Sequence, residues 1–287
     1  MAAWQPPSLY YGPEYVRFQC RFPTSLPLIG LAMFRGKEPI GFIAAMGRSS
    51  TAGELYLSSL LSFVPGTDPI LPMVLVRREN RMIEQLGKRV LLFTRAGSPG
   101  EALVRSRASS RRKCVSLGQL RLHASSGVQQ ASTICIREVK PETWGIEADR
   151  LRDSELLSPA LNLPDLQHFG GDPHGGRRFL LATNDSGHVL ATAMLGFTQS
   201  AEHGEIRAVP SLHYVRLAEQ RPEPLRGLLA YARNESSPVV LVPNTTTIES
   251  GLARAAGLRG IPTVYTAHLC TDAADAISVR GTEFEIV

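Results

Sequence analysis

The apolar and polar positions of this chain predict short strands alternating with amphipathic helices. Val90–Phe93 and Val239–Val242 are uninterrupted apolar runs, and a small polar turn follows each of them. Beyond each turn the apolar residues recur at helical spacing, so each segment predicts a strand, a turn and a helix in succession. This pattern is typical of an α/β protein.

A comparison of the two halves of the sequence indicates an internal repeat. Val90–Ala108 aligns with Val239–Gly257 without a gap, at an offset of 149 residues, and Leu31–Met46 aligns with Leu180–Leu195 at the same offset. The second pair predicts a β-hairpin in each half, because turn-forming residues separate two apolar runs. Two matches at one offset indicate a duplicated unit.

Both units are expected to follow the same order of elements. The first is predicted to contain a strand at Val16–Phe22, the hairpin, a strand at Glu54–Val64, a helix at Ile70–Leu86, the Val90 strand, a helix from Pro99 and a strand at Lys113–His123. The second is predicted to contain a strand at Thr133–Val139, a helix at Pro141–Asp153, a loop, the hairpin, a strand at His203–Ala218, a helix at Pro222–Asn234, the Val239 strand, a helix at Ile248–Ala256 and a strand at Pro262–Leu269. The polar stretch Ala124–Ser132 predicts a linker, so the expected units are residues 1–125 and 126–287.

Composition indicates the size of the core, the cellular location and the state of the cysteines. With 287 residues and 43% apolar side chains, the chain is long enough to bury a substantial core. Its longest apolar stretch, Ile70–Val76, is too short to cross a bilayer, and the N-terminus lacks a signal-peptide pattern. We therefore expect a cytoplasmic protein without a membrane segment. The four cysteines (Cys20, Cys114, Cys135 and Cys270) show no C-x-x-C spacing, which predicts reduced thiols and neither a zinc nor a redox motif.

The chain has a formal net charge of +5, and much of the excess lies in one segment. The residues concerned are Arg105, Arg107, Arg111, Arg112 and Lys113. They form either a solvated helix followed by a basic loop, or a contact surface for the phosphates of a nucleotide or nucleic acid.

The second unit resembles the GNAT superfamily of acyl-CoA-dependent N-acyltransferases. The segment VVLVPNTTTIESGLARAAGLRGIPTVYTAHL carries this resemblance, with Asn244 after the fifth strand and Gly257 ending the helix. The first unit resembles the family at Tyr11, at Tyr15 and its neighbours, and from Gly30 to Val64.

The resemblance implies a fold and a reaction. The fold would be α/β (α+β), with two tandem GNAT-like units, each a mixed, mainly antiparallel sheet flanked by helices. The co-substrate would be acetyl-CoA or another acyl-CoA, and the acceptor would be a small-molecule or peptide amine.

In this family the fourth and fifth strands splay apart, and the pantetheine arm pairs with the fourth strand. Backbone N–H groups at the start of the next helix hold the diphosphate. The cofactor-binding residues that the resemblance implies are Val215, Leu217, Gln220, Arg221, Arg226 and Asn244. Both units depart from the family's phosphate loop: the first has Asp68–Leu71 there, and the second has Glu223 between two prolines. A carboxylate repels phosphate, and proline lacks an N–H.

Acyl transfer to an amine needs a base for the ammonium proton and an acid for the leaving thiolate. The base candidates are Glu205 and His213 on the long fourth strand, and the acid candidates are Tyr214 and Tyr265. The first unit offers Glu54 and Tyr56 instead. A histidine or tyrosine on a strand is, however, more often an ordinary core or surface residue than a catalyst.

Two further features have competing interpretations. The loop HFGGDPHGGRR (His168–Arg178) has three possible interpretations. It is either a flexible connection leading into a strand, a metal site formed by His168, Asp172 and His174, or an anion-binding loop with Arg177 and Arg178. We assign it no chemistry and expect no metal. Pro210 marks either the end of the fourth strand or a bulge and splayed edge within it.

Three functions follow from these patterns. The first is an N-acyltransferase, active in the second unit, with the first unit as a structural or acceptor-shaping partner. The second is an inactive GNAT-like scaffold, since both phosphate loops are altered. The third is transfer from an aminoacyl-tRNA, which would use the basic residues near Arg111 and would make nucleic acid a partner.

Overall fold

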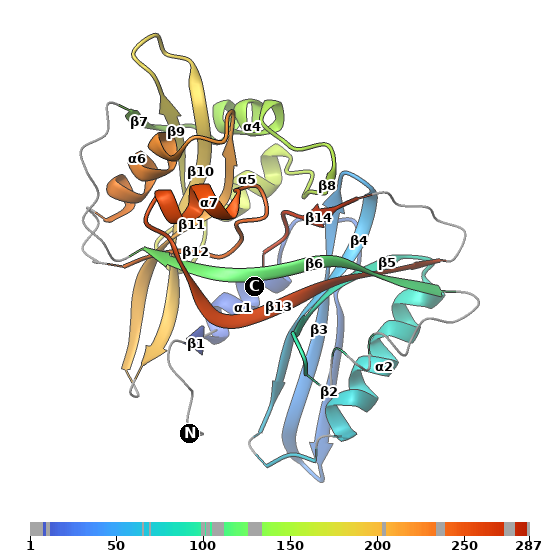
Figure 1. The fold of residues 1–287 in the computed structure, drawn as a ribbon. Coiled ribbons are helices and arrows are strands. Elements are labelled where there is room, and N and C mark those ends of the chain that lie inside the picture. Colours follow the sequence, from blue (N-terminus) through green and yellow to red (C-terminus); the bar gives the residue numbers. More distant parts are fainter. Residues whose placement is uncertain are drawn as a thin grey trace.

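The computed structural model of this chain describes residues 8–9, 12–64, 66–68, 70–98, 101, 104, 112–125, 134–202, 205–233, 239–272 and 279–285. These residues form a mixed, mainly antiparallel sheet of 12 strands with helices on it (Figure 1). The strands of this sheet are β1 (Ser8–Leu9), β2 (Ile29–Arg35), β3 (Glu38–Ser50), β4 (Gly53–Phe63), β5 (Arg89–Arg95), β6 (Arg112–Ser125), β7 (Cys135–Val139), β9 (Arg178–Thr183), β10 (Val189–Glu202), β11 (Glu205–Leu217), β12 (Val240–Val242) and β13 (Arg259–Asp272). The predicted fold class is confirmed.

Helices and one small sheet complete the described part of the chain. The helices are α1 (Pro13–Cys20), α2 (Ile70–Gln85), α4 (Pro141–Arg150), α5 (Leu163–Gly170), α6 (Pro222–Arg233) and α7 (Ser250–Ala255). Strands β8 (Leu156–Leu157) and β14 (Gly281–Thr282) pair in a separate two-stranded sheet. No helix among the described residues is long and apolar enough to span a membrane.

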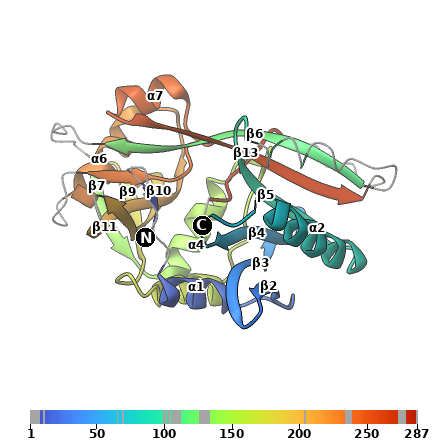
Figure 2. The same cartoon turned by 90° about the horizontal axis from the view of Figure 1, so that it is seen from below.

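The two closing strands, β6 and β13, exchange places between the halves. The strand order is β2-β3-β4-β5-β13-β6-β12-β11-β10-β9-β7, so β13 pairs with β5 of the first half and β6 pairs with β12 of the second. The same two strands also pair with each other, and they run together across the molecule in both views (Figures 1 and 2). Each half therefore completes its sheet with a strand from the other.

This exchange corrects the prediction for two of the cysteines. Cys114 on β6 and Cys270 on β13 are directly opposite in register and form a disulfide, whereas reduced thiols were predicted. Their separation of 156 residues gave no local signal, because only the strand exchange brings them together. Cys20 and Cys135 are free.

The predicted strand at Val16–Phe22 is wrong, because Val16–Cys20 belong to helix α1, which begins at Pro13. Its sequence, VRFQCRF, alternates apolar and polar residues as a half-buried strand does. Pro13 at the first helical turn and the helical spacing of Tyr15, Phe18 and Phe22 oppose that pattern. Those three rings pack into an aromatic cluster with Trp144 and Phe169, and this burial decides for the helix.

The other predicted elements are present within a few residues of their expected bounds. The helix predicted from Pro99 lies mostly outside the described residues, as do Arg105, Arg107 and Arg111 of the basic segment. Of the expected linker Ala124–Ser132, the first two residues belong to β6, and the remainder lies outside the described residues.

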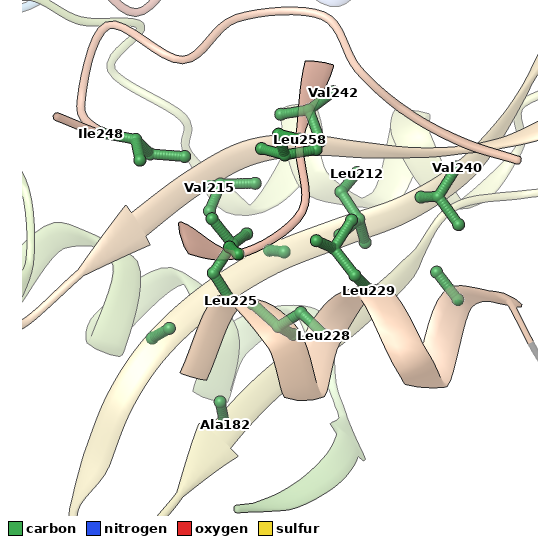
Figure 3. Close-up of a cluster of buried hydrophobic side chains, with 14 of the residues drawn as sticks. Ala182, Leu212, Val215, Leu225, Leu228, Leu229, Val240, Val242, Ile248 and Leu258 are labelled. Carbon is green, nitrogen blue, oxygen red and sulfur yellow. The ribbon is translucent and has the colours of Figure 1, made fainter. Parts of the chain in front are cut away.

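Helix α6 fixes strand β11 from one face. Leu225, Leu228 and Leu229, at the i, i+3, i+4 spacing of one helix face, contact Leu212 and Val215 of β11 (Figure 3). All five side chains are buried, and each contributes roughly 1.5–3 kcal/mol relative to exposure. This packing makes β11 a rigid support for the residues on its other face.

Both halves have a bulged strand that diverges from its parallel neighbour. In the first half, Ser59 is the extra residue of β4, and β4 pairs with β5 only from Leu55 to Ser58. In the second half, the bulge lies at Tyr214 and Val215, opposite Ala193, and β11 pairs with β12 only at Ser211. Pro210 itself pairs in register with Phe197 inside β11, so it marks neither the end of the strand nor a bulge; the bulge lies four residues beyond it.

Candidate active site

A cleft lies between the two halves. The first half contributes side chains from α1, β3 and β4, and the second contributes side chains from α5, β10 and β11. Leu57 lies just before the bulge of β4, Tyr214 lies at the bulge of β11, and Pro243 follows β12. The cleft therefore reaches the point of divergence in both halves.

The C-terminal segment 281–285 forms part of the cleft wall. The Asn244 side-chain amide donates to the carbonyls of Thr282 and Phe284, both at 2.9 Å. Arg216 forms a buried ion pair with Glu283, with Nη2 2.5 Å from Oε2. Removal of either charge would leave the other buried without its partner, which is strongly destabilising. These contacts hold the segment in place and bring Glu285 to the cleft.

Glu285 ends a chain of hydrogen bonds that begins at Thr198 in the cleft. Thr198 Oγ1 donates to Ser211 Oγ at 2.9 Å, and Ser211 Oγ lies 2.7 Å from His213 Nε2. His213 Nδ1 lies 2.5 Å from Glu285 Oε2. A carboxylate only accepts, so Nδ1 carries a proton and Nε2 of the neutral ring accepts from Ser211. A proton from the cleft can thus reach His213 through two hydroxyl groups, and Glu285 stabilises the imidazolium that results.

The same carboxylate holds the bulge of β11. Tyr214 has φ +48°, the one positive value among the described non-glycine residues, and its backbone N–H donates to Glu285 Oε1 at 2.8 Å. A residue in this left-handed region persists only where its surroundings impose it. Glu285 therefore orients His213 with one oxygen and supports the strained Tyr214 with the other.

The loop His168–Arg178, for which the sequence allowed three interpretations, forms a defined part of the cleft. A capping box between Asn162 and Asp165 starts α5, and a tight turn after it places His174 and Arg177 at the cleft. Asp172 accepts from Arg177 Nε at 3.2 Å, so the loop is built around an ion pair. Among the described residues no three His, Cys, Asp or Glu side chains gather as a metal site.

Burial sets the protonation of the cleft's phenols and guanidinium groups. It raises the pKa of Tyr15 and of Tyr214, despite the opposing attraction of Arg177, so both hydroxyls remain donors. Burial lowers the pKa of Arg48 to about 10, which leaves it charged at neutral pH. Burial by itself would lower the pKa of Arg177, but the nearby Tyr15, Asp172 and Glu285 together raise it above its usual value.

Comparison with known proteins identifies the fold. No protein-family model matches this sequence, and no curated protein does. N-myristoyltransferase from Saccharomyces cerevisiae with bound myristoyl-CoA matches with a TM-score of 0.63 and 11% identity, over 94% of this chain and 73% of that chain. A GCN5-related N-acetyltransferase from Sphaerobacter thermophilus matches with a TM-score of 0.55 and 16% identity, over 86% of this chain and 81% of that chain. The chain has a tandem GNAT fold.

Within this tandem GNAT fold, the polar cofactor residues expected in the second half have internal partners. Gln220 donates to the Thr247 carbonyl and accepts from the Glu249 N–H, Arg226 donates to the Ala255 carbonyl, and Arg221 pairs with Glu219. Asn244 binds the C-terminal segment, as described above. Val215 is buried against α6, and Leu217 is partly buried there.

The four predicted catalytic residues lie in different places. The cleft brings together His213 and Tyr214. Tyr265 lies on β13, between β5 and β6, and is not among the cleft residues. Glu205 opens β11 opposite Glu202, and its side chain lies outside the described residues. Of the candidates in the first half, Glu54 pairs with Lys88 at the surface, and Tyr56 is buried in the core.

Several residues of the cleft were not predicted from the sequence. They are Tyr15, Arg48, Thr198 and Glu285, together with the buried Ser211 that links Thr198 to His213. The Ser211-x-His213 spacing was the one usable signal, because residues i and i+2 share one face of a strand. Glu285 is 72 residues from His213 and had no local signal.

Proposed function

We propose that this chain is an acyl-CoA-dependent N-acyltransferase whose acceptor amine enters the cleft between the two halves. The observation that carries the proposal is the hydrogen-bond chain from Thr198 to Glu285, at a cleft that both diverging strands reach. A buried imidazole with a carboxylate behind it is suited to general base catalysis. The tandem GNAT fold agrees with this chemistry.

The residues of the cleft account for the proton movements. The acceptor ammonium gives its proton to the Thr198 hydroxyl, which passes its own through Ser211 to His213 Nε2. The amine is then neutral and nucleophilic, and the imidazolium is stabilised by Glu285. Tyr15 and Tyr214 keep their protons and line the same cleft, so they can donate hydrogen bonds to the developing oxyanion or to the leaving thiolate.

The two halves differ in how well they fit an acyl-CoA, which when bound would supply the activated acyl group. In the second half the Val215 carbonyl already accepts from the Thr247 hydroxyl, and Glu283 and Glu285 lie in the gap. In the first half β4 continues beyond Ser58 to Phe63 without pairing to β5, so its backbone edge suits the amides of a pantetheine arm. We infer that the acyl donor binds along β4 of the first half, with the base in the second half and the acceptor in the cleft between them.

The diphosphate cradle of the family does not fit either half. At the start of α2, the Ile70 N–H already donates to the Asp68 carboxylate at 2.9 Å, which places a negative charge where a phosphate would need a donor. In the second half Glu223 lies in the first turn of α6. We therefore assign no residue to the diphosphate.

Thermal unfolding with acetyl-, octanoyl- and myristoyl-CoA tests the proposal. A ligand at a hundred times its Kd stabilises by about 2.7 kcal/mol, which is a readily measured rise in Tm. Mass spectrometry of reactions with a mixture of amino acids and short peptides should then detect an acylated amine. If no chain length raises Tm and no product forms, the acyltransferase proposal is wrong.

Hydrogen exchange tests which half binds the donor. Acyl-CoA should slow amide exchange in β4, from Ser59 to Phe63. Protection found only in β11, from His213 to Leu217, would instead place the donor in the second half.

A further inference from the structure

Arg48 is a buried charge in the cleft that no carboxylate of the described chain neutralises by an ion pair. It lies on β3, it is 6% exposed, and it lines both the main cleft and an adjoining open pocket. Its Nη1 donates to the Gly47 carbonyl at 2.8 Å, and its Nη2 donates to the Gln19 side chain at 3.0 Å. The guanidinium also lies over the Phe22 ring at 3.8 Å. All these partners are neutral.

The carboxylates nearest to this part of the cleft are engaged elsewhere. Asp172 pairs with Arg177, and Glu285 accepts from His213 and Tyr214. Asp165 attracts Arg48 but forms no ion pair with it, and its carboxylate accepts from the Asn162 N–H in the capping box of α5. Arg48 is thus the one cleft charge in the described chain that lacks a counter-charge in hydrogen-bond contact.

A buried guanidinium without a counter-charge lowers the free energy of unfolding, and such a group is well suited to bind an anion. Taking a cation out of water without an opposite charge is unfavourable, and burial accordingly lowers its pKa. A planar guanidinium binds a carboxylate or a phosphate through two parallel hydrogen bonds. Phe169, Phe197 and Phe284 line the same cleft, so the remainder of the ligand is expected to be apolar or aromatic.

We propose that Arg48 binds an anionic group on the acceptor, so that the substrate is an amine that also carries a carboxylate or phosphate on an apolar body. This inference rests on the proposed acyltransferase function, because it identifies the class of acceptor. An aromatic amino acid, or a short peptide with a free carboxylate, has this chemistry.

Four matched probes separate the contributions of amine and anion. They are phenylalanine, with both groups; phenethylamine, with the amine alone; 3-phenylpropionate, with the carboxylate alone; and phenyl phosphate, with a phosphate alone. At millimolar concentration phenylalanine and at least one of the two anions should raise Tm, and phenethylamine should raise it less. The relative shifts given by 3-phenylpropionate and phenyl phosphate distinguish a carboxylate site from a phosphate site. Equal shifts for phenylalanine and phenethylamine would contradict the proposal.

Arg48→Met removes the charge and keeps an unbranched side chain of similar length. The variant should unfold at the same or a higher temperature without ligand, and it should lose the shift given by the anionic probes. In the acylation assay the KM for phenylalanine should rise at least tenfold, so that the preference over phenethylamine approaches one. Arg35→Met, at the exposed end of β2, is the matched control and should retain the preference.

A purely structural role for Arg48 makes the opposite prediction. In that case Arg48→Met would lower Tm and leave the preference for phenylalanine unchanged, and the proposal would be wrong. Failure of the acyltransferase proposal is distinguishable, because it would abolish product formation with every amine and leave the anion-dependent Tm shift intact.

Discussion

At the scale of single residues, Glu285 serves two groups at once. One carboxylate oxygen faces the His213 ring and the other accepts from the Tyr214 backbone. The negative charge matters to the first contact, because it stabilises a protonated imidazole. It matters less to the second, since any acceptor can bind a neutral N–H. Substitution can therefore separate the catalytic contribution of Glu285 from its structural one.

Glu285→Gln should lower kcat by about 10²–10⁴-fold, the usual contribution of general acid–base catalysis, with a much smaller effect on KM. An amide of the same shape can still accept from Tyr214, so Tm should change little. Steady-state kinetics and thermal unfolding check this prediction. Glu219→Gln, at an exposed position, is the control. A full kcat in Glu285→Gln would exclude the Thr198–Glu285 chain as the base.

His168 should make stability dependent on pH. Burial lowers its pKa, and its Nε2 lies 3.0 Å from the Phe18 carbonyl. The unfolded state then binds more protons near and below pH 6.5, so stability is lost as pH falls through this range, by at most about 1.4 kcal/mol per pH unit. Urea unfolding at pH 7.5 and pH 5.0 should show a smaller difference in His168→Gln than in wild type. The exposed control His188→Gln should behave as wild type, and an unchanged difference in His168→Gln would contradict the assignment.

Sequence patterns predicted only part of the candidate site. His213 and Tyr214 were candidates because their strand was recognisable and their side chains have suitable chemistry. Glu285 follows β14 in a segment with no periodic pattern, and Thr198 and Arg48 lie among apolar residues of long hairpin strands. Their importance comes from contacts between segments that are far apart in sequence.

At the scale of elements, local patterns were sufficient where each element depends mainly on its own sequence. The hairpins β2–β3 and β9–β10, and the helices α2, α4 and α6, were predicted from turn residues and helical spacing. Helix α1 was misassigned, because its alternating residues satisfy a strand pattern and only tertiary packing decides. The partners of β6 and β13 could not be predicted, since strand alternation does not specify which neighbour a strand pairs with.

The disulfide should stabilise the exchanged pair of strands. Cys114 and Cys270 close a loop of 156 residues, and removing a crosslink of this kind typically costs about 2–5 kcal/mol. Cys114→Ser, Cys270→Ser and the double variant should therefore lose the same unfolding free energy, with no additivity. The exposed Cys135→Ser should lose almost none. A thiol titration of denatured, unreduced protein that finds four thiols in place of two would contradict the disulfide.

At the scale of the whole molecule, the exchange makes the halves dependent on each other. Without β13, strand β5 would expose an edge that readily pairs with other chains. Without β6, β12 would lose its antiparallel neighbour in the same way. The proposed units, residues 1–125 and 126–287, are therefore expected to be structural repeats that do not fold independently.

Cleavage between the repeats tests this dependence. A protease site inserted at residues 126–133 should give two fragments that co-elute in size-exclusion chromatography under reducing conditions, where the disulfide cannot hold them. Residues 1–125 expressed alone should aggregate, because the edge of β5 is unprotected. Two separate, soluble and monomeric fragments would contradict the expected dependence.

The strand exchange also has a consequence for the order of events during synthesis. The first repeat is synthesised long before β13, so that repeat must wait with an incomplete sheet until β13 has also been made. The segment that carries Glu285 emerges later still. A chain that terminates early therefore lacks both the last strand of its first repeat and the carboxylate of its cleft. Completion of the first repeat and completion of the candidate site thus depend on two segments that follow closely on each other in synthesis, β13 and the segment with Glu285.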